Sequence, residues 1–364
     1  MRKHNDYCII LAGGIGRRLW PCSRKDMPKQ FIDFFGTGQT LLQQTYARFA
    51  RFIPAERIII STFEDYRETV IRQLPAVPAE NILAEPVQLS TAPAVAWASI
   101  HIEQRDPEAN VVVVPSDHHI VDEECFVRQI GEGLDFVECH DDFLAMGIKA
   151  TVPNSAYGYI QTGSVSGDNE HRWRVKSFTE KPQPEYARVF VESGEFLWNT
   201  GIFLWNCRTM NRLLRQMAPM LLERIGPACS ARLTPSEKMH LIQTLYPASM
   251  HSTVDLVILN RREDVFVQEC GFGWADVGCW PEIYKVSEQD GDGNVRLNGS
   301  QVMFSGCRDN LVRLPRNVAA VVRNLEGYVV ALDGNALLIC PNDDPSLVRR
   351  LVNEAQMKLG EEFV

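Results

Sequence analysis

Residues 7–31 of the chain read YCIILAGGIGRRLWPCSRKDMPKQF. The apolar run at residues 7–11 predicts a strand that is buried on both faces, as strands of parallel sheets usually are. Three glycines, Gly13, Gly14 and Gly16, follow this strand directly and allow the backbone to turn sharply. Because α/β folds bind ligands at the carboxyl ends of their strands, the loop is a candidate phosphate-binding element.

The loop also carries four cations, Arg17, Arg18, Arg24 and Lys29, which together could neutralise a polyphosphate. It matches neither of the two common glycine loops. No Gly-Lys-Ser/Thr follows a four-residue spacer, and a dinucleotide fingerprint placed on Gly14 and Gly16 puts Leu19 where Gly or Ala is needed. From the glycines alone, a simple turn with solvated arginines remains an equal alternative.

The composition bounds the class of protein. A chain of 364 residues is long enough for one large domain and a smaller one. Its formal charge of −9 argues against a nucleic-acid polymer as partner. The polar N-terminus carries no signal-peptide core, and no apolar run approaches the ~20 residues needed to span a bilayer. We therefore expect a cytoplasmic protein without a membrane contact, and its ten scattered cysteines should be thiols.

Strand-like and helical segments alternate through the first two thirds of the chain. Strands are expected at residues 57–60, 81–84, 111–114 and 143–148, and helices at 39–52, 64–74, 91–104 and within 210–245. This alternation predicts an α/β fold with a Rossmann-like, mostly parallel sheet flanked by helices. From about residue 292 short strand-like runs follow one another without helices, until a last helix begins near Pro345. We expect domains at residues 1–288 and 289–364.

The block Leu19-Trp20-Pro21 with Ser23-Arg24 and Pro28-Lys29-Gln30-Phe31 resembles the signature of the sugar-1-phosphate nucleotidyltransferases. It has the form carried by the monofunctional mannose-1-phosphate guanylyltransferases, and the resemblance extends over roughly residues 7–340. It implies a nucleotidyltransferase (GT-A-like) fold with a C-terminal left-handed β-helix, and a homodimer. It also implies GTP and mannose 1-phosphate as substrates, Mg²⁺ as cofactor and a role in GDP-mannose biosynthesis.

The resemblance assigns Arg18, Lys29 and Asp117 to catalysis. It assigns nucleotide binding to Leu11, Ala12, Gly13, Gly14, Gly16, Arg17, Arg18, Lys29, Glu85, Thr91, Pro93 and Ser116. Glu85 could accept hydrogen bonds from N1–H and the 2-amino group of guanine. One departure lies nearby, because Leu89-Ser90 stands where the family usually has Arg-Asn.

Two carboxylates are candidate metal ligands. Asp117 follows the valine strand 111–114, and Asp276 lies in Trp274-Ala275-Asp276-Val277-Gly278-Cys279-Trp280, which departs from the usual family motif only at Ala275 and Cys279. Mg²⁺ is commonly held by one or two carboxylates, with phosphate and water as its other ligands. Taken alone, an aspartate after a strand is more often a helix cap or turn residue, and the resemblance to the family's metal motif favours the ligand.

The sugar phosphate is assigned to Gly158, Glu180, Lys181 and Asn199. Glu180 would accept from sugar hydroxyls and Lys181 would contact the phosphate as a point charge. Asn199 is an amide in an apolar strand and needs a partner, which is a sugar hydroxyl in the family. The structural alternative is an asparagine whose amide is satisfied by the protein backbone.

The resemblance implies an enzyme that transfers the guanylyl group of GTP to α-D-mannose 1-phosphate by in-line displacement. Three alternatives stay open at this point. The chain could use another nucleotide or sugar, it could be a catalytically idle sugar-nucleotide sensor, or it could be a Rossmann oxidoreductase. The missing third glycine disfavours the oxidoreductase.

Overall fold

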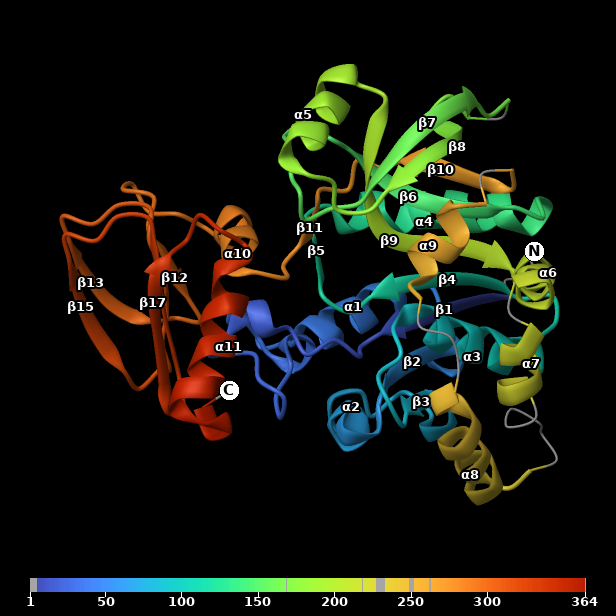
Figure 1. Cartoon of the computed structure of the whole chain (residues 1–364), viewed down its shortest axis with the longest axis horizontal. Coiled ribbons are helices and arrows are strands. Elements are labelled where there is room, and N and C mark those ends of the chain that lie inside the picture. The colour runs from blue at the N-terminus through green and yellow to red at the C-terminus, as the bar shows by residue number, and fades with distance from the viewer. Residues whose placement is uncertain are drawn as a thin grey trace. The chain divides into compact units, whose positions relative to one another are not determined.

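The computed structural model describes residues 5–167, 169–217, 219–226, 233–248, 252–261 and 263–363 (Figure 1). The chain divides into two compact units. The first unit comprises Met1–Gly13, Tyr46–Pro115 and Ile120–Trp274, and the second comprises Gly14–Thr45, Ser116–His119 and Ala275–Val364. The glycine loop therefore groups with the C-terminal residues. The boundary expected at residues 288–289 stays a prediction.

The described residues of the first unit form a nine-stranded sheet. Its strands, in spatial order, are β3 (Ile82–Glu85), β2 (Ile58–Phe63), β1 (Asp6–Leu11), β4 (Asn110–Pro115), β9 (Phe196–Asn206), β6 (Phe143–Lys149), β10 (Val265–Glu269), β8 (Arg172–Thr179) and β7 (Tyr159–Val165). The pairs among β1 to β4 and the pair β6–β10 are parallel, while β9, β8 and β7 run antiparallel to their neighbours. The expected α/β class with a mostly parallel sheet is confirmed.

The order of the strands explains where the functional loops begin. From β1 the chain continues to β2 and β3 on one side, and β4 then pairs with β1 on the other side, with Leu11 opposite Pro115. The loops after β1 and β4 thus start at neighbouring strand ends, where the strand order reverses. Ligands of open α/β sheets bind at this point of the topology.

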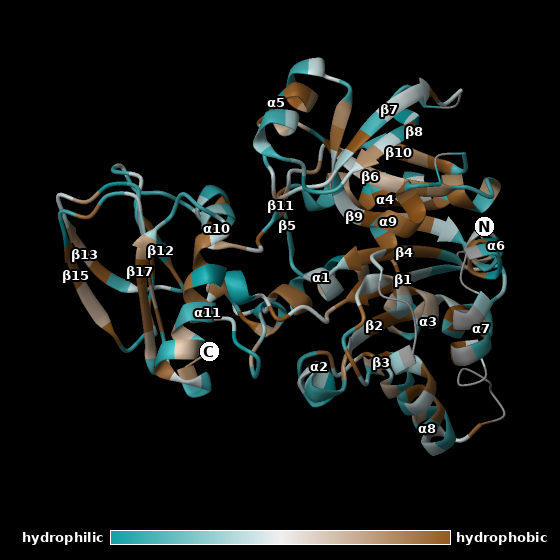
Figure 2. Ribbon diagram, in the orientation of Figure 1, coloured by the Kyte–Doolittle hydropathy of each residue, from teal (hydrophilic) through white to brown (hydrophobic). Residues whose placement is uncertain are grey.

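Helices connect these strands and supply apolar faces to the core. They are α1 (Leu41–Phe49), α2 (Arg67–Gln73), α3 (Thr91–Glu103), α4 (Glu123–Cys139), α5 (Pro184–Ser193), α6 (Cys207–Met217), α7 (Pro219–Ile225), α8 (Pro235–Leu245) and α9 (Val254–Leu259). The apolar colour of β1 and β4 in Figure 2 agrees with their buried side chains. Helix α3 is buried on nearly all sides, as a helix without a polar face must be. No helix in the described part of the chain has the length and apolar character to cross a membrane.

The second unit contains stacked parallel strands. β12 (Val295–Leu297), β14 (Leu311–Arg313) and β16 (Tyr328–Asp333) pair in parallel, and so do β13 (Gln301–Ser305) and β15 (Ala319–Arg323). β17 (Ala336–Pro341) closes the first of these sheets in antiparallel orientation, and α10 (Trp280–Val286) and α11 (Leu347–Leu359) complete the unit. The arrangement is consistent with the expected β-helix-like region.

An asparagine ladder joins successive rungs of these strands. Asn310 Nδ2 donates to Asn294 Oδ1 at 2.9 Å and to the Leu325 carbonyl at 2.7 Å. Its own Oδ1 accepts from the Tyr328 amide at 3.0 Å. Because Asn310 is fully buried, water cannot replace these bonds.

We expect Asn310→Ala to lower the free energy of unfolding by about 2–4 kcal/mol, because it leaves the Tyr328 N–H without its acceptor and removes the Asn310 side-chain bonds to Asn294 and to the Leu325 carbonyl. Gln301→Ala, on the exposed side of β13, is the control and should change stability by less than about 0.5 kcal/mol. Urea unfolding of the full chain measures both. Equal stability of the two variants would show that the ladder contributes nothing.

Candidate active site

Two acidic and two basic side chains from three distant segments meet in the second unit. Lys29 begins a short 3₁₀ helix (Lys29–Phe31), Asp117 lies between β4 and β5 (His118–Ile120), and Asp276 ends β11 (Trp274–Asp276). Lys29 Nζ forms an ion pair with Asp117 Oδ2 and lies 4.0 Å from Asp276 Oδ1. Arg18 Nη2 lies 4.0 Å from Asp276 Oδ2. All four residues were predicted from the sequence, and the structure brings them together.

Burial strengthens the electrostatics of this cluster. The side chains of Lys29 and Asp117 are only 12% and 14% exposed. Burial alone would lower the pKa of Lys29, but the carboxylates of Asp117 and Asp276 outweigh it and raise that pKa above its ordinary value. Burial likewise opposes ionisation of Asp117, and the Lys29 ammonium outweighs it, so the pKa of Asp117 is lowered. Both groups are therefore held in their charged forms.

Gly16 allows the glycine loop to pack against the stem of Lys29. Its φ of +71° is a left-handed conformation that favours glycine. A Cβ at this position would lie 2.8 Å from Ser23 Oγ and 2.9 Å from Lys29 Cγ. A side chain at residue 16 would therefore displace Lys29, so this glycine positions the catalytic candidate.

The donor set fits Mg²⁺. Asp117 and Asp276 both lie within ion-pair distance of one ammonium group, so a small cation near that position would meet oxygens from both. Among the residues that the structure describes, no group of three or more His, Cys, Asp or Glu side chains could hold a metal. Two carboxylates with open positions for phosphate and water match the usual coordination of Mg²⁺.

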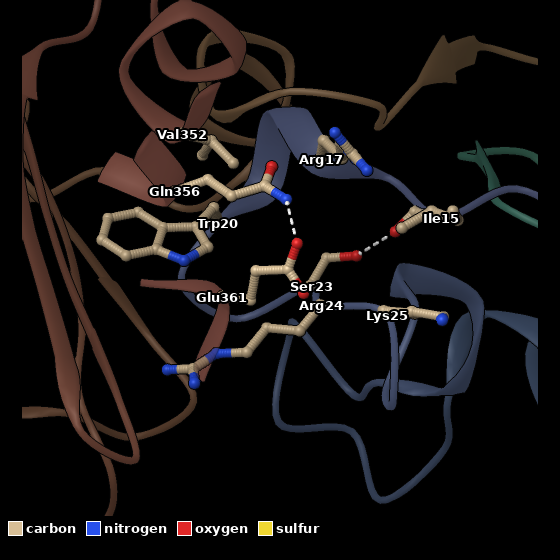
Figure 3. A pocket seen from close by; sticks show the side chains of 9 residues that line it. All are labelled: Ile15, Arg17, Trp20, Ser23, Arg24, Lys25, Val352, Gln356 and Glu361. Carbon is tan, nitrogen blue, oxygen red and sulfur yellow. Dashed lines mark hydrogen bonds between the residues drawn. The ribbon is translucent and has the colours of Figure 1, made fainter. Parts of the chain in front are cut away.

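The other cations of the loop occupy a different place. Arg17 lines a pocket of about 240 Å³ together with Trp20, Ser23, Arg24, Lys25 and residues of the C-terminal segment (Figure 3). Arg24 donates to the carbonyls of Pro21 and Asp333 and to Asn335 Oδ1. The expectation that Arg24 serves a polyphosphate gives way to a structural role, because its donors already bind the protein. The nucleotide role of Arg17 stays a prediction.

The start of the loop is held by the neighbouring strand. Leu11 ends β1, and Ala12 is buried, with its N–H donating to the Ser61 carbonyl at 2.7 Å and its carbonyl accepting from Thr62 Oγ1 at 3.0 Å. Gly13 lies against the Phe63 ring, whereas Gly14 is exposed with open space beside it. Of these residues, Gly14 has the room that a ligand approaching the main chain would need.

Ser116 and Glu85 are buried and hydrogen-bonded within the protein. The Ser116 carbonyl accepts from Thr45 Oγ1 at 3.1 Å. Glu85, 4% exposed, accepts from Tyr246 Oη and from Ser61 Oγ, the latter at 3.3 Å. Burial raises the pKa of Glu85 to about 7, although both hydrogen bonds act in the opposite direction. Its carboxyl oxygens are thus engaged by protein partners, and the guanine-reading role stays a prediction.

The loop before α3 is strained at the position where the sequence departs from the family. Ser90 adopts φ 90° and ψ 179°, a region that is nearly restricted to glycine and costs about 1–3 kcal/mol. Two bonds to residues 252 and 254, at the start of α9, hold the loop. The Ala92 N–H donates to the Ser252 carbonyl at 3.0 Å, and Thr91 Oγ1 accepts from the Val254 N–H at 2.9 Å. Thr91 and the buried Pro93 form the first turn of α3.

The four residues assigned to the sugar phosphate are neighbours in the first unit. A Cβ on Gly158 would lie 2.9 Å from Glu180 Oε2, so the absence of a side chain permits this close approach. The Gly158 carbonyl accepts from the Asn199 N–H at 2.8 Å, and Lys181 Nζ donates to Glu180 Oε1 at 2.6 Å. The structure thus brings together Gly158, Glu180, Lys181 and Asn199.

The sequence reasoning missed Asp255, which lies on α9 and joins this group. Asn199 Nδ2 donates to Asp255 Oδ1 at 2.6 Å. The amide of Asn199 is therefore satisfied by a side chain rather than by backbone alone. The sequence offered one sign of this residue, because Thr253 and Asp255 are polar positions at the start of an otherwise apolar helix. Such a pattern usually indicates only a helix cap.

Comparison with known proteins gives matches along nearly the whole chain. The family model described as nucleotidyl transferase matches residues 7–293. The xanthan biosynthesis protein XanB of Xanthomonas campestris pv. campestris (strain B100) is 32% identical over 348 residues, which cover 95% of this chain and 72% of that protein. A mannose-1-phosphate guanylyltransferase of Escherichia coli is 30% identical over 358 residues, 98% of this chain and 75% of that protein.

The fold matches a solved structure as well. A crystal structure described as a mannose-1-phosphate geranyltransferase from Thermus thermophilus has a TM-score of 0.85 and 29% sequence identity to this chain. The match covers 97% of this chain and 99% of that one. The similarity therefore includes the β-rich C-terminal residues.

The raised pKa of Glu85 predicts a pH dependence of stability. In the unfolded chain this carboxyl should titrate near 4.5, and in the folded chain near 7, so the native state binds more protons between these values. Its contribution is fully present below about pH 4.5 and is lost as the pH rises to about 7, a change on the order of 3 kcal/mol. Glu85→Gln should remove this decline in urea-unfolding free energies measured from pH 5 to 8. Parallel curves for wild type and variant would contradict the raised pKa.

Proposed function

The chain belongs to the nucleotidyl transferase family, and on that premise we propose that it transfers the guanylyl group of GTP to α-D-mannose 1-phosphate. The products are GDP-mannose and pyrophosphate. The relatives named mannose-1-phosphate guanylyltransferase support this choice of substrates, since they match nearly the whole chain. The sequence signature at residues 19–31 agrees with this choice.

The observation that carries the proposal is the partly buried cluster of Lys29, Asp117 and Asp276. Joining two phosphate compounds requires opposite charge near both of them, because the reactants repel each other. The cluster supplies two carboxylates suited to a divalent cation and, beside them, fixed positive charge from Lys29 and Arg18. A glycine loop with an open position at Gly14 begins the same segment.

In the proposed reaction a phosphate oxygen of mannose 1-phosphate attacks the α-phosphorus of GTP. A new phosphorus–oxygen bond forms as the bond to the β-phosphate oxygen breaks, and pyrophosphate leaves with the bonding electrons. The attacking oxygen is already anionic, so no general base is needed, and catalysis consists of positioning and charge neutralisation. Lys29 and Arg18 would stabilise the charge that develops on the pyrophosphate.

Asp117 and Asp276 would hold Mg²⁺, which supplies neutralisation of charge on the reacting phosphates. The loop residues assigned above, with Thr91, Pro93 and Ser116, would bind the nucleotide. Gly158, Glu180, Lys181 and Asn199 would bind the sugar phosphate. The homodimer and the cytoplasmic location stay predictions from the sequence, and light scattering of the purified protein measures the first of them.

A pyrophosphate-release assay tests the proposed function. Each of GTP, ATP, UTP and dTTP is combined with a panel of sugar 1-phosphates, with Mg²⁺ and with excess chelator. We expect the fastest release from GTP with mannose 1-phosphate and none in chelator. A different preferred pair would identify another nucleotidyltransferase, and no release from any pair would indicate a sugar-nucleotide sensor.

Lys29→Ala should lower kcat by roughly 10²–10³-fold, because it removes a preorganised charge from the transition state. Lys25→Ala is the matched control, since it removes the same charge from an exposed position of the same loop, and we expect its kcat within about twofold of wild type. Steady-state rates and thermal melting are measured for both. Equal rates for the two folded variants would remove Lys29 from the mechanism.

A further inference from the structure

Asp255 forms a side-chain hydrogen bond to an amide assigned to the sugar. The bond from Asn199 Nδ2 to Asp255 Oδ1 is 2.6 Å long and joins β9 to α9 across 56 positions of sequence. A short bond from an amide to a carboxylate is stronger than one between neutral groups. The position of this amide therefore depends on a residue outside the sequence motifs that predicted the site.

The carboxylate and the Gly201 N–H together determine which way the amide faces. An ionised carboxylate only accepts hydrogen bonds, so Asn199 must turn its Nδ2 toward Asp255. Its Oδ1 then accepts from the Gly201 N–H at 3.1 Å. One N–H of Nδ2 and one lone pair of Oδ1 remain for a ligand, and their directions are fixed. Without the carboxylate, only the Gly201 N–H would favour this orientation of the amide over the one with donor and acceptor exchanged.

Asp255 lies among the residues assigned to the sugar phosphate. Burial raises the pKa of its carboxyl, and so does the negative charge of Glu180, while Asn199 and the Lys181 cation lower it. Asp255 thus interacts electrostatically with both members of the Glu180–Lys181 pair. In addition, Asp255 Oδ1 lies 3.9 Å from the position that a Cβ on Gly201 would occupy.

The helix that carries Asp255 is fixed from the other side. The Val254 N–H donates to Thr91 Oγ1 at 2.9 Å, and Thr253 Oγ1 caps the helix by accepting from Leu256 N–H at 3.3 Å. Thr91 belongs to the residues assigned to the nucleotide. The position of Asp255 relative to Asn199 is consequently held by contacts that do not involve Gly158, Glu180 or Lys181.

We propose that Asp255 is a positioning residue for the sugar phosphate, which orients the Asn199 amide so that its free donor and acceptor meet hydroxyl groups of the pyranose. This inference rests on the proposed function and adds to it a residue that the family signature does not supply. It makes the Asn199–Asp255 pair one determinant of sugar binding, beside Glu180 and Lys181.

The test is a double-mutant cycle on the full chain. Asp255→Asn keeps the shape of the side chain but removes the charged acceptor of the Asn199 amide, so that the Gly201 N–H alone favours its present orientation. We expect its KM for mannose 1-phosphate to rise roughly tenfold or more, with the KM for GTP within about twofold of wild type. In an Asn199→Ala background, Asp255→Asn should have no further effect on that KM, because the amide it orients is gone.

A structural control separates orientation from the placement of α9. Thr253→Ala removes the helix cap, while the bond from the Val254 N–H to Thr91 Oγ1 still holds the start of the helix and with it Asp255. It should therefore lower the melting temperature without changing the KM for mannose 1-phosphate. Circular dichroism shows whether each variant is folded. A KM rise in Thr253→Ala equal to that in Asp255→Asn would overturn the proposal, because helix position alone would then explain both.

The other outcomes are equally decisive. An unchanged KM in folded Asp255→Asn, or additive effects of the two substitutions, would show that Asp255 does not act through Asn199. If the wild-type chain releases no pyrophosphate, the proposed function fails, and calorimetric titration with mannose 1-phosphate alone then tests the inference without turnover. A loss of affinity in Asp255→Asn would support it, and equal affinity of variant and wild type would refute it.

Discussion

The ammonium group of Lys29 beside two carboxylates is the interaction on which the candidate site depends. Burying charges costs several kcal/mol for each ion, and a well-packed apolar cluster of similar volume would often be as stable or more so. A partly buried ion cluster of this kind is therefore weak evidence for a role in stability. The same arrangement is well suited to phosphate chemistry, because its charges are fixed in place and act in a low-dielectric environment.

The topology of the sheet explains how such distant residues can meet. β1 and β4 are neighbours, and the chain leaves both at the edge where the strand order reverses. Lys29 lies in the loop that follows β1, and Asp117 lies shortly after β4. Asp276 follows the last residue of the first unit, Trp274. Gly16 then decides how closely the loop approaches the Lys29 stem. Each of these residues belongs to a short sequence motif of its own, but only the fold brings them to one place.

The fold likewise brings together the four residues assigned to the sugar phosphate, through hydrogen bonds and one ion pair between Lys181 and Glu180. Gly158 permits close approach of Glu180, and its carbonyl holds the backbone of Asn199. Asp255 then fixes the amide of Asn199. A site that distinguishes one hydroxyl arrangement from another needs donors and acceptors of known direction, because unpaired polar groups in a wrong complex reduce its stability.

The sequence by itself determined the class of the fold, the position of most strands, and the identity of the charged and glycine residues at the site. It could do so because buried strands and glycine loops leave local patterns, and because the motifs follow one another in the family order. It missed α5 and the three-residue strand β14, whose buried Arg313 interrupts the apolar pattern and pairs with Asp333.

Only the tertiary structure decided that Arg24 binds the β-rich region, that the Glu85 carboxyl is held by Tyr246, and that Asp255 meets Asn199. These partners lie tens to hundreds of positions apart, so no local pattern records them, and the packing of helices and strands alone brings their atoms within hydrogen-bonding distance.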